Sequence, residues 1–284
     1  MPATDTPRSY RSHDGLELFY RDFAPDSPGV PVLCLPGLTR NSRDFEDLGL
    51  HLSATRRVLA PDLRGRGFSQ HDPDWRNYHP GTYVRDVLTL LDLLRIERVI
   101  IIGTSLGGLI AMAMALRDPT RLRGVVLNDV GPEIAPEGLA RIRKYTGRLP
   151  PVADWNEAIA QTREVYGAAL PGLSADDWRK MARRAYRESD DGIPRLDIDP
   201  GIGEAVRVVG PQTLDPWQAF DALRETPLLV LRGAMSDILS EATLKRMQER
   251  NPDLTAVTVP DRGHVPLLNE PECISAIENF IRSL

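Results

Sequence analysis

The sequence has few of the features that mark secreted, membrane or nucleic-acid-binding proteins. Its 284 residues include only two cysteines, Cys34 and Cys273, which cannot build a disulfide framework and are not spaced as C-x-x-C. No apolar run approaches the ~20 residues that cross a bilayer, and the first fifteen residues contain no apolar signal core. The net charge of −5 argues against nucleic acid or an anionic membrane as the main partner. We therefore expect a cytoplasmic protein whose two cysteines lie in the core.

Repeats and low-complexity segments are absent too, and what remains is an alternation of buried strands and helices. Asp14-Gly15 is a strong signal for an N-terminal hairpin. Apolar runs and helical spacing then predict strands at Val32–Leu35, Arg57–Ala60, Val99–Ile102, Gly124–Asn128, Leu228–Arg232 and Leu254–Val259, and helices at Asp44–Leu52, Tyr83–Leu94, Leu106–Leu116, Glu241–Arg250 and Pro271–Arg282. This alternation is typical of an α/β protein with one parallel sheet.

The alternation is interrupted between residues 131 and 213. This stretch is basic and aromatic and contains no clear strand, with helices predicted at Pro136–Tyr145, Trp155–Tyr166 and Asp176–Arg187. Because strands resume after Thr226, we expect one core made of residues 1–130 and 214–284, with residues 131–213 inserted as a helical cap.

The motif around which the chain is organised is Gly103-Thr104-Ser105-Leu106-Gly107. It stands where the buried strand Val99–Ile102 must turn into the apolar helix Leu106–Leu116. A turn this tight leaves little room for Cβ atoms, which explains its glycines. It would hold the Ser105 hydroxyl exposed above a helix N-terminus. A G-x-S-x-G can also be a plain turn, but the strand before it and the helix after it favour a nucleophile.

A serine hydroxyl needs a base to become a nucleophile, and the base needs a carboxylate to orient it. In an open α/β sheet such groups gather beyond the carboxyl ends of the strands. His264 follows the last predicted strand, which is the expected place for the base. The other four histidines lie in the hairpin, in a helix and in a polar loop: His13, His51, His71 and His79.

Two aspartates compete to orient His264. Asp237 follows the strand Leu228–Arg232, and Asp129 stands at the end of the preceding strand. Asp261 is nearer to His264 in sequence, but we expect it to brace its loop. We favour Asp237 and keep Asp129 as the alternative.

The order Ser105, Asp237, His264 on these connections resembles the α/β-hydrolase superfamily over nearly the whole chain. The matching motifs are Leu35-Pro36-Gly37-Leu38 after the third strand, Asp62–Ser69 (DLRGRGFS) after the fourth, and Asn128–Pro132 (NDVGP) where the insertion begins. The resemblance implies a mostly parallel central sheet with flanking helices and an inserted helical cap. It also implies catalysis by a triad, without a metal or cofactor.

In that family two backbone N–H groups form the oxyanion hole. Carried over by position, these belong to Leu38 and Leu106. Pro36-Gly37 stands where many relatives have His-Gly, but proline does not remove the Leu38 amide. Relatives that cleave carbon–halogen or epoxide bonds use aspartate as nucleophile, so Ser105 argues against those reactions.

The resemblance leaves three functions to consider. The first is a serine hydrolase that cleaves a small carboxylic ester or lactone through an acyl-enzyme. The second uses the same triad to hydrolyse a carbon–carbon bond in a dienoic ring-cleavage product. The third is a non-catalytic ligand receptor, which the intact triad disfavours. The expected partner is a small molecule, with no nucleic acid or membrane, and the sequence is compatible with a homo-oligomer.

Aromatic and basic residues in or near the cap are the candidates for contact with substrate. We predict substrate binding by Arg40, Tyr145, Trp155 and Trp217. Arg40 or an arginine of the cap would then bind a substrate carboxylate, although a basic face exposed to solvent is the default interpretation. Arg64 and its glycines are expected to brace their loop.

Overall fold

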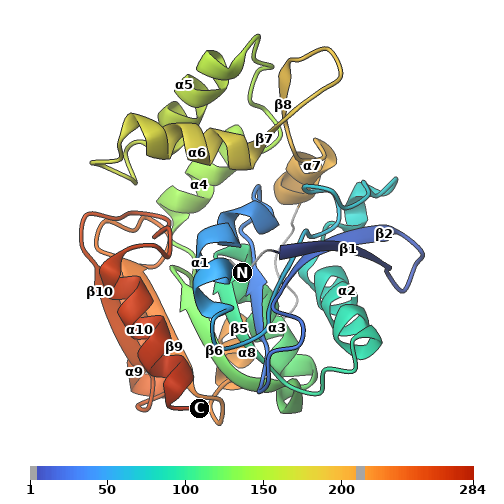
Figure 1. The fold of residues 1–284 in the computed structure, drawn as a ribbon. Helices are drawn as coiled ribbons and strands as arrows, with labels where there is room; N and C mark the ends of the chain where they lie inside the picture. The colour runs from blue at the N-terminus through green and yellow to red at the C-terminus, as the bar shows by residue number, and fades with distance from the viewer. Residues whose placement is uncertain (1–4, 209–214) are drawn as a thin grey trace.

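A computed structural model describes residues 5–208 and 215–284 and places an eight-stranded sheet at the centre of the molecule (Figure 1). The strand order is β1-β2-β4-β3-β5-β6-β9-β10. The strands are β1 (Asp5–Arg11), β2 (Glu17–Phe23), β3 (Val32–Leu35), β4 (Val58–Pro61), β5 (Val99–Thr104), β6 (Leu122–Asn128), β9 (Leu228–Gly233) and β10 (Thr255–Val259). The hairpin β1–β2 and the pair β2–β4 are antiparallel, and the other pairs are parallel. The fold is therefore the predicted α/β-hydrolase architecture.

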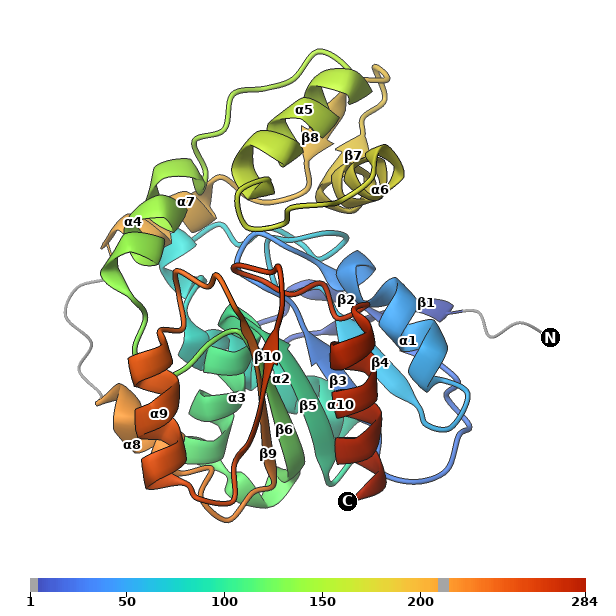
Figure 2. The same ribbon diagram turned by 90° about the vertical axis from the view of Figure 1, so that its left-hand side faces the viewer.

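Helices cover both faces of the sheet, which explains why its central strands are apolar on both sides (Figure 2). One face packs against α1 (Glu46–Leu52) and α10 (Pro271–Arg282), and its core includes the free, buried Cys34 and Cys273. On the other face lie α2 (Pro80–Leu93), α3 (Leu106–Arg117), α8 (Pro216–Asp221) and α9 (Glu241–Arg250). The short 3₁₀ helices are Ser42–Phe45, Trp75–Asn77 and Pro119–Arg121. The prediction of two core cysteines is confirmed.

The segment of residues 136–208, between β6 and β9, rises above the carboxyl ends of the strands (Figure 2). It contains α4 (Pro136–Tyr145), α5 (Trp155–Tyr166), α6 (Ala175–Ala185), β7 (Tyr186–Glu188), β8 (Pro194–Leu196) and α7 (Gly201–Val208). We call this segment the lid. Helices α4 and α5 have the predicted bounds. The expectation of no strand here was wrong, because residues 186–196 form a small antiparallel hairpin of the β7–β8 pair.

The hairpin escaped prediction because each of its strands has only three residues, too few to show an alternating pattern. The predicted end of the cap at Thr213 lies outside the described residues, so the domain boundaries stay a prediction. Among the described residues, no helix combines the length and the apolar character that crossing a bilayer requires.

Candidate active site

Ser105 stands at a sharp turn between β5 and α3. Its backbone has φ 50° and ψ −110°, a conformation that an L-residue adopts only when its surroundings enforce it. The turn is crowded: a Cβ at Gly103 would lie 2.5 Å from the carbonyl carbon of Gly107, and a Cβ at Gly107 would overlap the Leu35 carbonyl. The glycines are therefore required by close backbone contact, as the sequence indicated.

The Ser105 hydroxyl lies within hydrogen-bond distance of a histidine that is itself bonded to an aspartate. His264 Nε2 is 2.9 Å from Ser105 Oγ, and His264 Nδ1 is 2.8 Å from Asp129 Oδ2. The two contacts use opposite sides of one imidazole ring. With Nδ1 protonated and donating to Asp129, Nε2 is free to accept the serine proton.

Asp129 directly follows β6 and has a fully buried side chain. Besides the imidazole, its carboxylate accepts hydrogen bonds from the Gly233 N–H at 2.8 Å and from the Ser236 hydroxyl at 2.7 Å. Three donors around one buried carboxylate satisfy its charge and fix its orientation.

The structure corrects the choice of Asp237 as the partner of His264. The Asp237 side chain turns toward the lid, where Arg141 of α4 donates to both of its oxygens at 2.6 and 2.8 Å. Burial acts to raise the pKa of the Asp237 carboxyl, but the hydrogen bonds and charge of Arg141 outweigh burial and lower it. Ser236 in the loop after β9 thus donates a hydrogen bond to Asp129. Asp237 of the same loop instead pairs with Arg141 of α4.

Sequence reasoning missed the roles of Gly233 and Ser236, and it ranked Asp129 second. The signal for Asp129 was present, because β6 lies between β5 and β9 in the sheet and this residue directly follows it. The strand order places the end of β6 next to the end of β5, and knowledge of that order would have favoured Asp129 over Asp237. Nothing in the sequence marks Ser236 as a donor to Asp129.

The two amides predicted to form the oxyanion hole lie beside the serine. Leu38 lines the same pocket as Ser105, and its N–H donates to no acceptor in the described part of the chain. Leu106 is the first residue of α3, where an N–H has no partner within the helix. Whether they bind an oxyanion stays a prediction.

A buried arginine holds the loop that carries Leu38. Arg66 is completely buried, and its Nε donates to the Leu38 carbonyl at 3.0 Å. Its Nη1 donates to the Arg64 carbonyl and to the Tyr83 hydroxyl, both at 2.8 Å. Among the described residues, its hydrogen bonds go to carbonyl and hydroxyl oxygens and not to a carboxylate.

A pocket of about 880 Å³, counted out to its open mouth, contains Ser105 and His264 in its wall. The core contributes residues from the loops after β3 and β10, and the lid contributes a largely apolar roof: Ile142, Tyr145, Tyr166, Leu170, Met181 and Arg184. Burial raises the pKa of the Tyr145 hydroxyl, which therefore stays neutral at physiological pH.

Of the four predicted substrate contacts, two line this pocket and two do not. Arg40 and Tyr145 are pocket residues, although Arg40 is already paired through two hydrogen bonds with Asp44. Trp155 instead packs inside the lid and donates its Nε1 to Glu188. Trp217 belongs to α8 and is buried in the main core. The prediction was wrong for both tryptophans, because each satisfies its indole N–H through a carboxylate away from the pocket.

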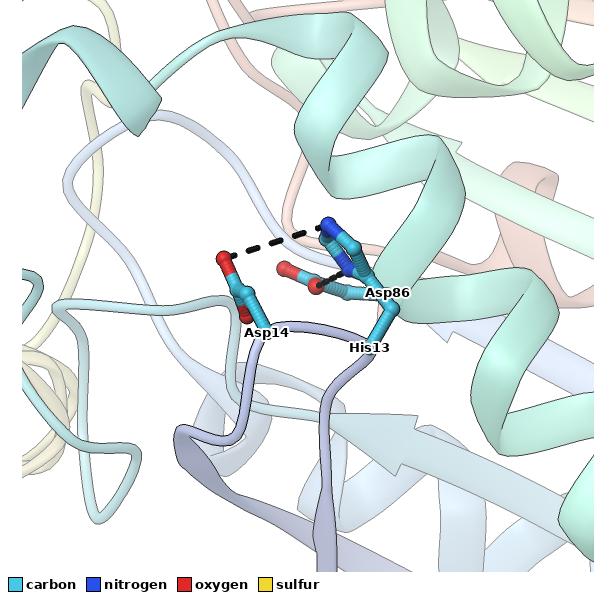
Figure 3. A group of neighbouring side chains, drawn as sticks. All are labelled: His13, Asp14 and Asp86. Carbon is cyan, nitrogen blue, oxygen red and sulfur yellow. Dashed lines mark ion pairs between the residues drawn. The ribbon is translucent and has the colours of Figure 1, made fainter.

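One group of side chains outside this pocket has the geometry of a metal site: His13, Asp14 and Asp86 (Figure 3). His13 is 3.6 Å from Asp86 and 3.9 Å from Asp14. The fully buried Arg64, however, already pairs with both aspartates and with Asp72 at 2.5 to 2.9 Å. Since a guanidinium neutralises these carboxylates, the chemistry of the group is that of a braced loop and does not fit a metal.

Known proteins share this architecture and its sequence motifs. The family model described as the alpha/beta hydrolase fold matches residues 30–271. This chain belongs to the α/β-hydrolase fold family. A 3-hydroxybutyrate-oligomer hydrolase from Cupriavidus necator is 34% identical over 264 residues, covering 90% of this chain and 89% of the relative. The chain is a hydrolase of this family.

Solved structures of hydrolases agree closely with the fold. An α/β hydrolase from Novosphingobium aromaticivorans is 43% identical, with a TM-score of 0.93 and coverage of 99% of both chains. A 2-hydroxymuconate semialdehyde hydrolase from a Pseudomonas species is 42% identical over 66% of this chain and 62% of that protein. The chain is therefore similar to hydrolases whose names give different substrates, a 3-hydroxybutyrate oligomer in one and 2-hydroxymuconate semialdehyde in the other.

Proposed function

We propose that this hydrolase cleaves a small carboxylic ester through an acyl-enzyme on Ser105. The observation that carries the proposal is the continuous hydrogen-bonded chain from Ser105 Oγ through both nitrogens of His264 to the buried Asp129. In this arrangement His264 can act as the base for the Ser105 hydroxyl, and Asp129 fixes the imidazole in the tautomer that carries its proton on Nδ1.

In the first half-reaction, Ser105 Oγ attacks the ester carbonyl while His264 Nε2 takes its proton. The negative oxygen of the tetrahedral intermediate accepts hydrogen bonds from the Leu38 and Leu106 amides, and loss of one such donor typically costs ~10²–10³ in turnover. The intermediate collapses, and His264 returns the proton to the leaving alcohol. Asp129 stabilises the imidazolium in between.

In the second half-reaction, His264 takes a proton from water, which attacks the acyl-enzyme and forms a second tetrahedral intermediate. Collapse of this intermediate returns the proton to Ser105 and releases the carboxylic acid. No other reactant is required. The similarity to a 3-hydroxybutyrate-oligomer hydrolase favours short oligoesters of a hydroxy acid as the substrates to try first.

A second candidate is carbon–carbon bond hydrolysis with the same three side chains. The similarity to a 2-hydroxymuconate semialdehyde hydrolase supports it, and Arg40 and Arg184 stand in the pocket wall where a substrate carboxylate could bind. The existing ion pairs Arg40–Asp44 and Arg184–Asp47 weigh against it, because a carboxylate would have to compete with both. A lactone remains within the first proposal, since it is a cyclic ester.

The test compares four substrates with the purified protein: p-nitrophenyl acetate, its butyrate, a dimeric hydroxy-acid ester and a vinylogous diketone acid. We expect the esters to be hydrolysed much faster than the diketone acid, with activity lost in Ser105→Ala. A fluorophosphonate probe should label the unmodified protein and not the variant. Equal turnover by Ser105→Ala would overturn the serine mechanism, and preference for the diketone acid would select the second candidate. Hydrolysis rates for matched neutral and carboxylated esters test whether Arg40 binds a substrate carboxylate. Equal rates for the two esters would rule out that role.

A further inference from the structure

The loop of residues 62–69, which the proposed mechanism does not use, contributes two fully buried arginines. Arg64 pairs with three carboxylates, and these ion pairs account for its place as a brace of the loop. Arg66 instead donates, within the described part of the chain, to carbonyl and hydroxyl oxygens. One of these oxygens belongs to Leu38, so Arg66 bonds directly to the residue whose amide is predicted to bind the oxyanion.

Leu38 stands in a tight turn that lies against the nucleophile. The Arg40 N–H donates to the Gly37 carbonyl at 3.2 Å, which makes Leu38 a central residue of a four-residue turn. A Cβ at Gly37 would lie 3.9 Å from the Ser105 Cβ, so the turn passes close to the serine. Only the φ and ψ angles of Leu38 separate its N–H from its carbonyl. A group that holds the carbonyl therefore restrains the direction of the amide.

Arg66 is the group that holds this carbonyl. Its Nε donates to the Leu38 carbonyl at 3.0 Å, and its Nη1 donates to the Arg64 carbonyl at 2.8 Å. The Tyr83 hydroxyl accepts a further hydrogen bond from Nη1 at 2.8 Å. The guanidinium carbon lies 5.0 Å from the ring centroid of Tyr83 and 5.6 Å from that of Tyr78. Because the donors of a guanidinium point in fixed directions, these contacts define one position for the Leu38 carbonyl.

The backbone of Arg66 is fixed by the last part of the lid. Two backbone hydrogen bonds, 2.7 and 3.0 Å long, join residues 65–67 to residues 197–199. They flank Arg66, which pairs with Ile198 as an isolated antiparallel bridge. The arginine is therefore held at its backbone by the lid and at its side chain by the core.

We propose that Arg66 is a positioning residue of the oxyanion hole, which holds the Leu38 carbonyl so that the Leu38 N–H points at the ester oxygen in the transition state. Arg66 is fully buried and does not line the pocket, so it acts through Leu38 and not on the substrate. The directed hydrogen bonds of the guanidinium carry this role, and a positive charge alone is not sufficient. The inference rests on the proposed ester hydrolysis at Ser105.

The experiment compares two ketones as inhibitors, a butyl trifluoromethyl ketone and the same ketone without fluorine. Ser105 Oγ adds to the carbon of the fluorinated ketone, His264 takes the proton, and the ketone oxygen becomes an oxyanion in the hole. This adduct resembles the transition state, whereas the unfluorinated ketone binds without addition and resembles the ground state.

Arg66→Met removes every donor of the side chain while keeping an apolar chain in its place. We expect kcat for p-nitrophenyl acetate to fall about 30-fold with KM nearly unchanged, because the Leu38 amide is misdirected and not removed, and complete loss of a donor costs ~10²–10³. The inhibition constant of the fluorinated ketone should rise by the same factor. That of the unfluorinated ketone should stay within about twofold.

This pair of inhibitors separates positioning from a merely structural role. Loss of folded protein lowers kcat by reducing the number of active molecules, but it leaves both inhibition constants unchanged. A general loosening of the pocket weakens the binding of both ketones. A misdirected amide weakens only the ketone that forms an oxyanion.

Two further variants keep the test informative if Arg66→Met does not fold. Tyr83→Phe removes one acceptor of the guanidinium, and we expect about a threefold change in kcat and in the constant of the fluorinated ketone. Arg66→Lys keeps the charge but not the fork of donors, so its kcat should stay at least about fivefold below that of the unmodified enzyme.

The matched control is Arg121→Met. Arg121 also donates to two loop carbonyls, those of Ile96 and Glu97, both at 2.9 Å. These residues precede β5, at the end of the strand away from Ser105. We expect this variant to keep the kcat and both inhibition constants of the unmodified enzyme.

Three results would overturn the proposal. They are an unchanged inhibition constant of the fluorinated ketone in the folded Arg66 and Tyr83 variants, full activity in Arg66→Lys, and an equal loss in Arg121→Met. Failure of the proposed function has a different signature, because the unmodified protein would then show no Ser105-dependent hydrolysis of acetate.

Discussion

Two loops at the same edge of the sheet each present an aspartate, and they put these side chains to different uses. The loop after β6 buries Asp129 completely and gives its carboxylate three donors, one of which is His264. The loop after β9 leaves the Asp237 side chain 35% exposed and pairs it with Arg141 of the lid. The two strands are neighbours in the sheet, so the difference arises within the turns that follow them.

The comparison teaches that the donors around a carboxylate decide its role more than its place at a strand end. Asp129 adopts a left-handed backbone conformation, with φ 56°, directly after β6. Gly233 at the end of β9 and Ser236 of the loop that follows then donate to it. Each loop depends on the other: the first supplies the acid, and the second supplies the groups that hold it.

The largest expected effect comes from replacing Asp129 by asparagine, and the same replacement at Asp237 is the comparison. Asp129→Asn should lower kcat for a p-nitrophenyl ester by ~10⁴, because an amide facing Nδ1 favours the wrong imidazole tautomer. Asp237→Asn should change kcat by less than about threefold, since Asp237 makes its hydrogen bonds with Arg141. Steady-state kinetics, with circular dichroism as the check on folding, measure both. Comparable losses in the two variants would break the distinction between the loops.

A smaller effect is expected from Ser236→Ala. The variant removes the hydroxyl donor to Asp129 and the acceptor for the Ile238 and Leu239 N–H groups. We expect kcat to fall about tenfold and the free energy of unfolding to fall by about 1 kcal/mol.

The matched control is Ser240→Ala, which removes the N-cap of α9, a side chain whose hydrogen bonds go to Thr243 and not to Asp129 or His264. It should lose similar stability in urea unfolding and keep full activity. If Ser240→Ala reduces kcat as much as Ser236→Ala does, the effect belongs to the stability of the loop and not to the orientation of Asp129.

The smallest effect concerns the ion pair between Asp237 and Arg141. Because the pKa of Asp237 is lowered in the folded protein, the pair stabilises the fold above the unfolded pKa of about 3.9. This stability is lost as the pH falls through the folded pKa. Arg141→Met should therefore reduce the free energy of unfolding by at most about 1 kcal/mol at pH 7, because both side chains are partly exposed.

Urea unfolding at several pH values measures this prediction. The difference in stability between the unmodified protein and Arg141→Met should shrink toward zero as the pH falls below about 3.9. Hydrolysis of a short ester should be nearly unchanged at pH 7. A difference that stays constant with pH would mean that Arg141 stabilises the lid by packing.

The sequence predicted the fold, and it singled out two of the three side chains that the structure joins by hydrogen bonds, for reasons that can be traced. Buried strands such as β5 contain long apolar runs, here Val99–Ile102, and the elbow at Ser105 needs glycines at fixed offsets, so both leave local patterns. The contact between Asp129 and His264 spans 135 residues and depends on which strands are neighbours. Local pattern does not encode that information, and Asp237 was therefore preferred. The prediction that Trp155 and Trp217 contact substrate failed for a similar reason, because composition does not indicate which way a ring points.

The crowding at the elbow has a practical consequence for experiments on this protein. Since neither Gly103 nor Gly107 leaves space for even a methyl group, a random library will report both positions as inactive for the same reason: the polypeptide no longer packs. Loss of activity at these two glycines would be mistaken for evidence that they take part in catalysis. The neighbouring hydroxyl at Ser105 protrudes into an open chamber, so its removal is the one change in this turn that separates loss of reaction from loss of structure.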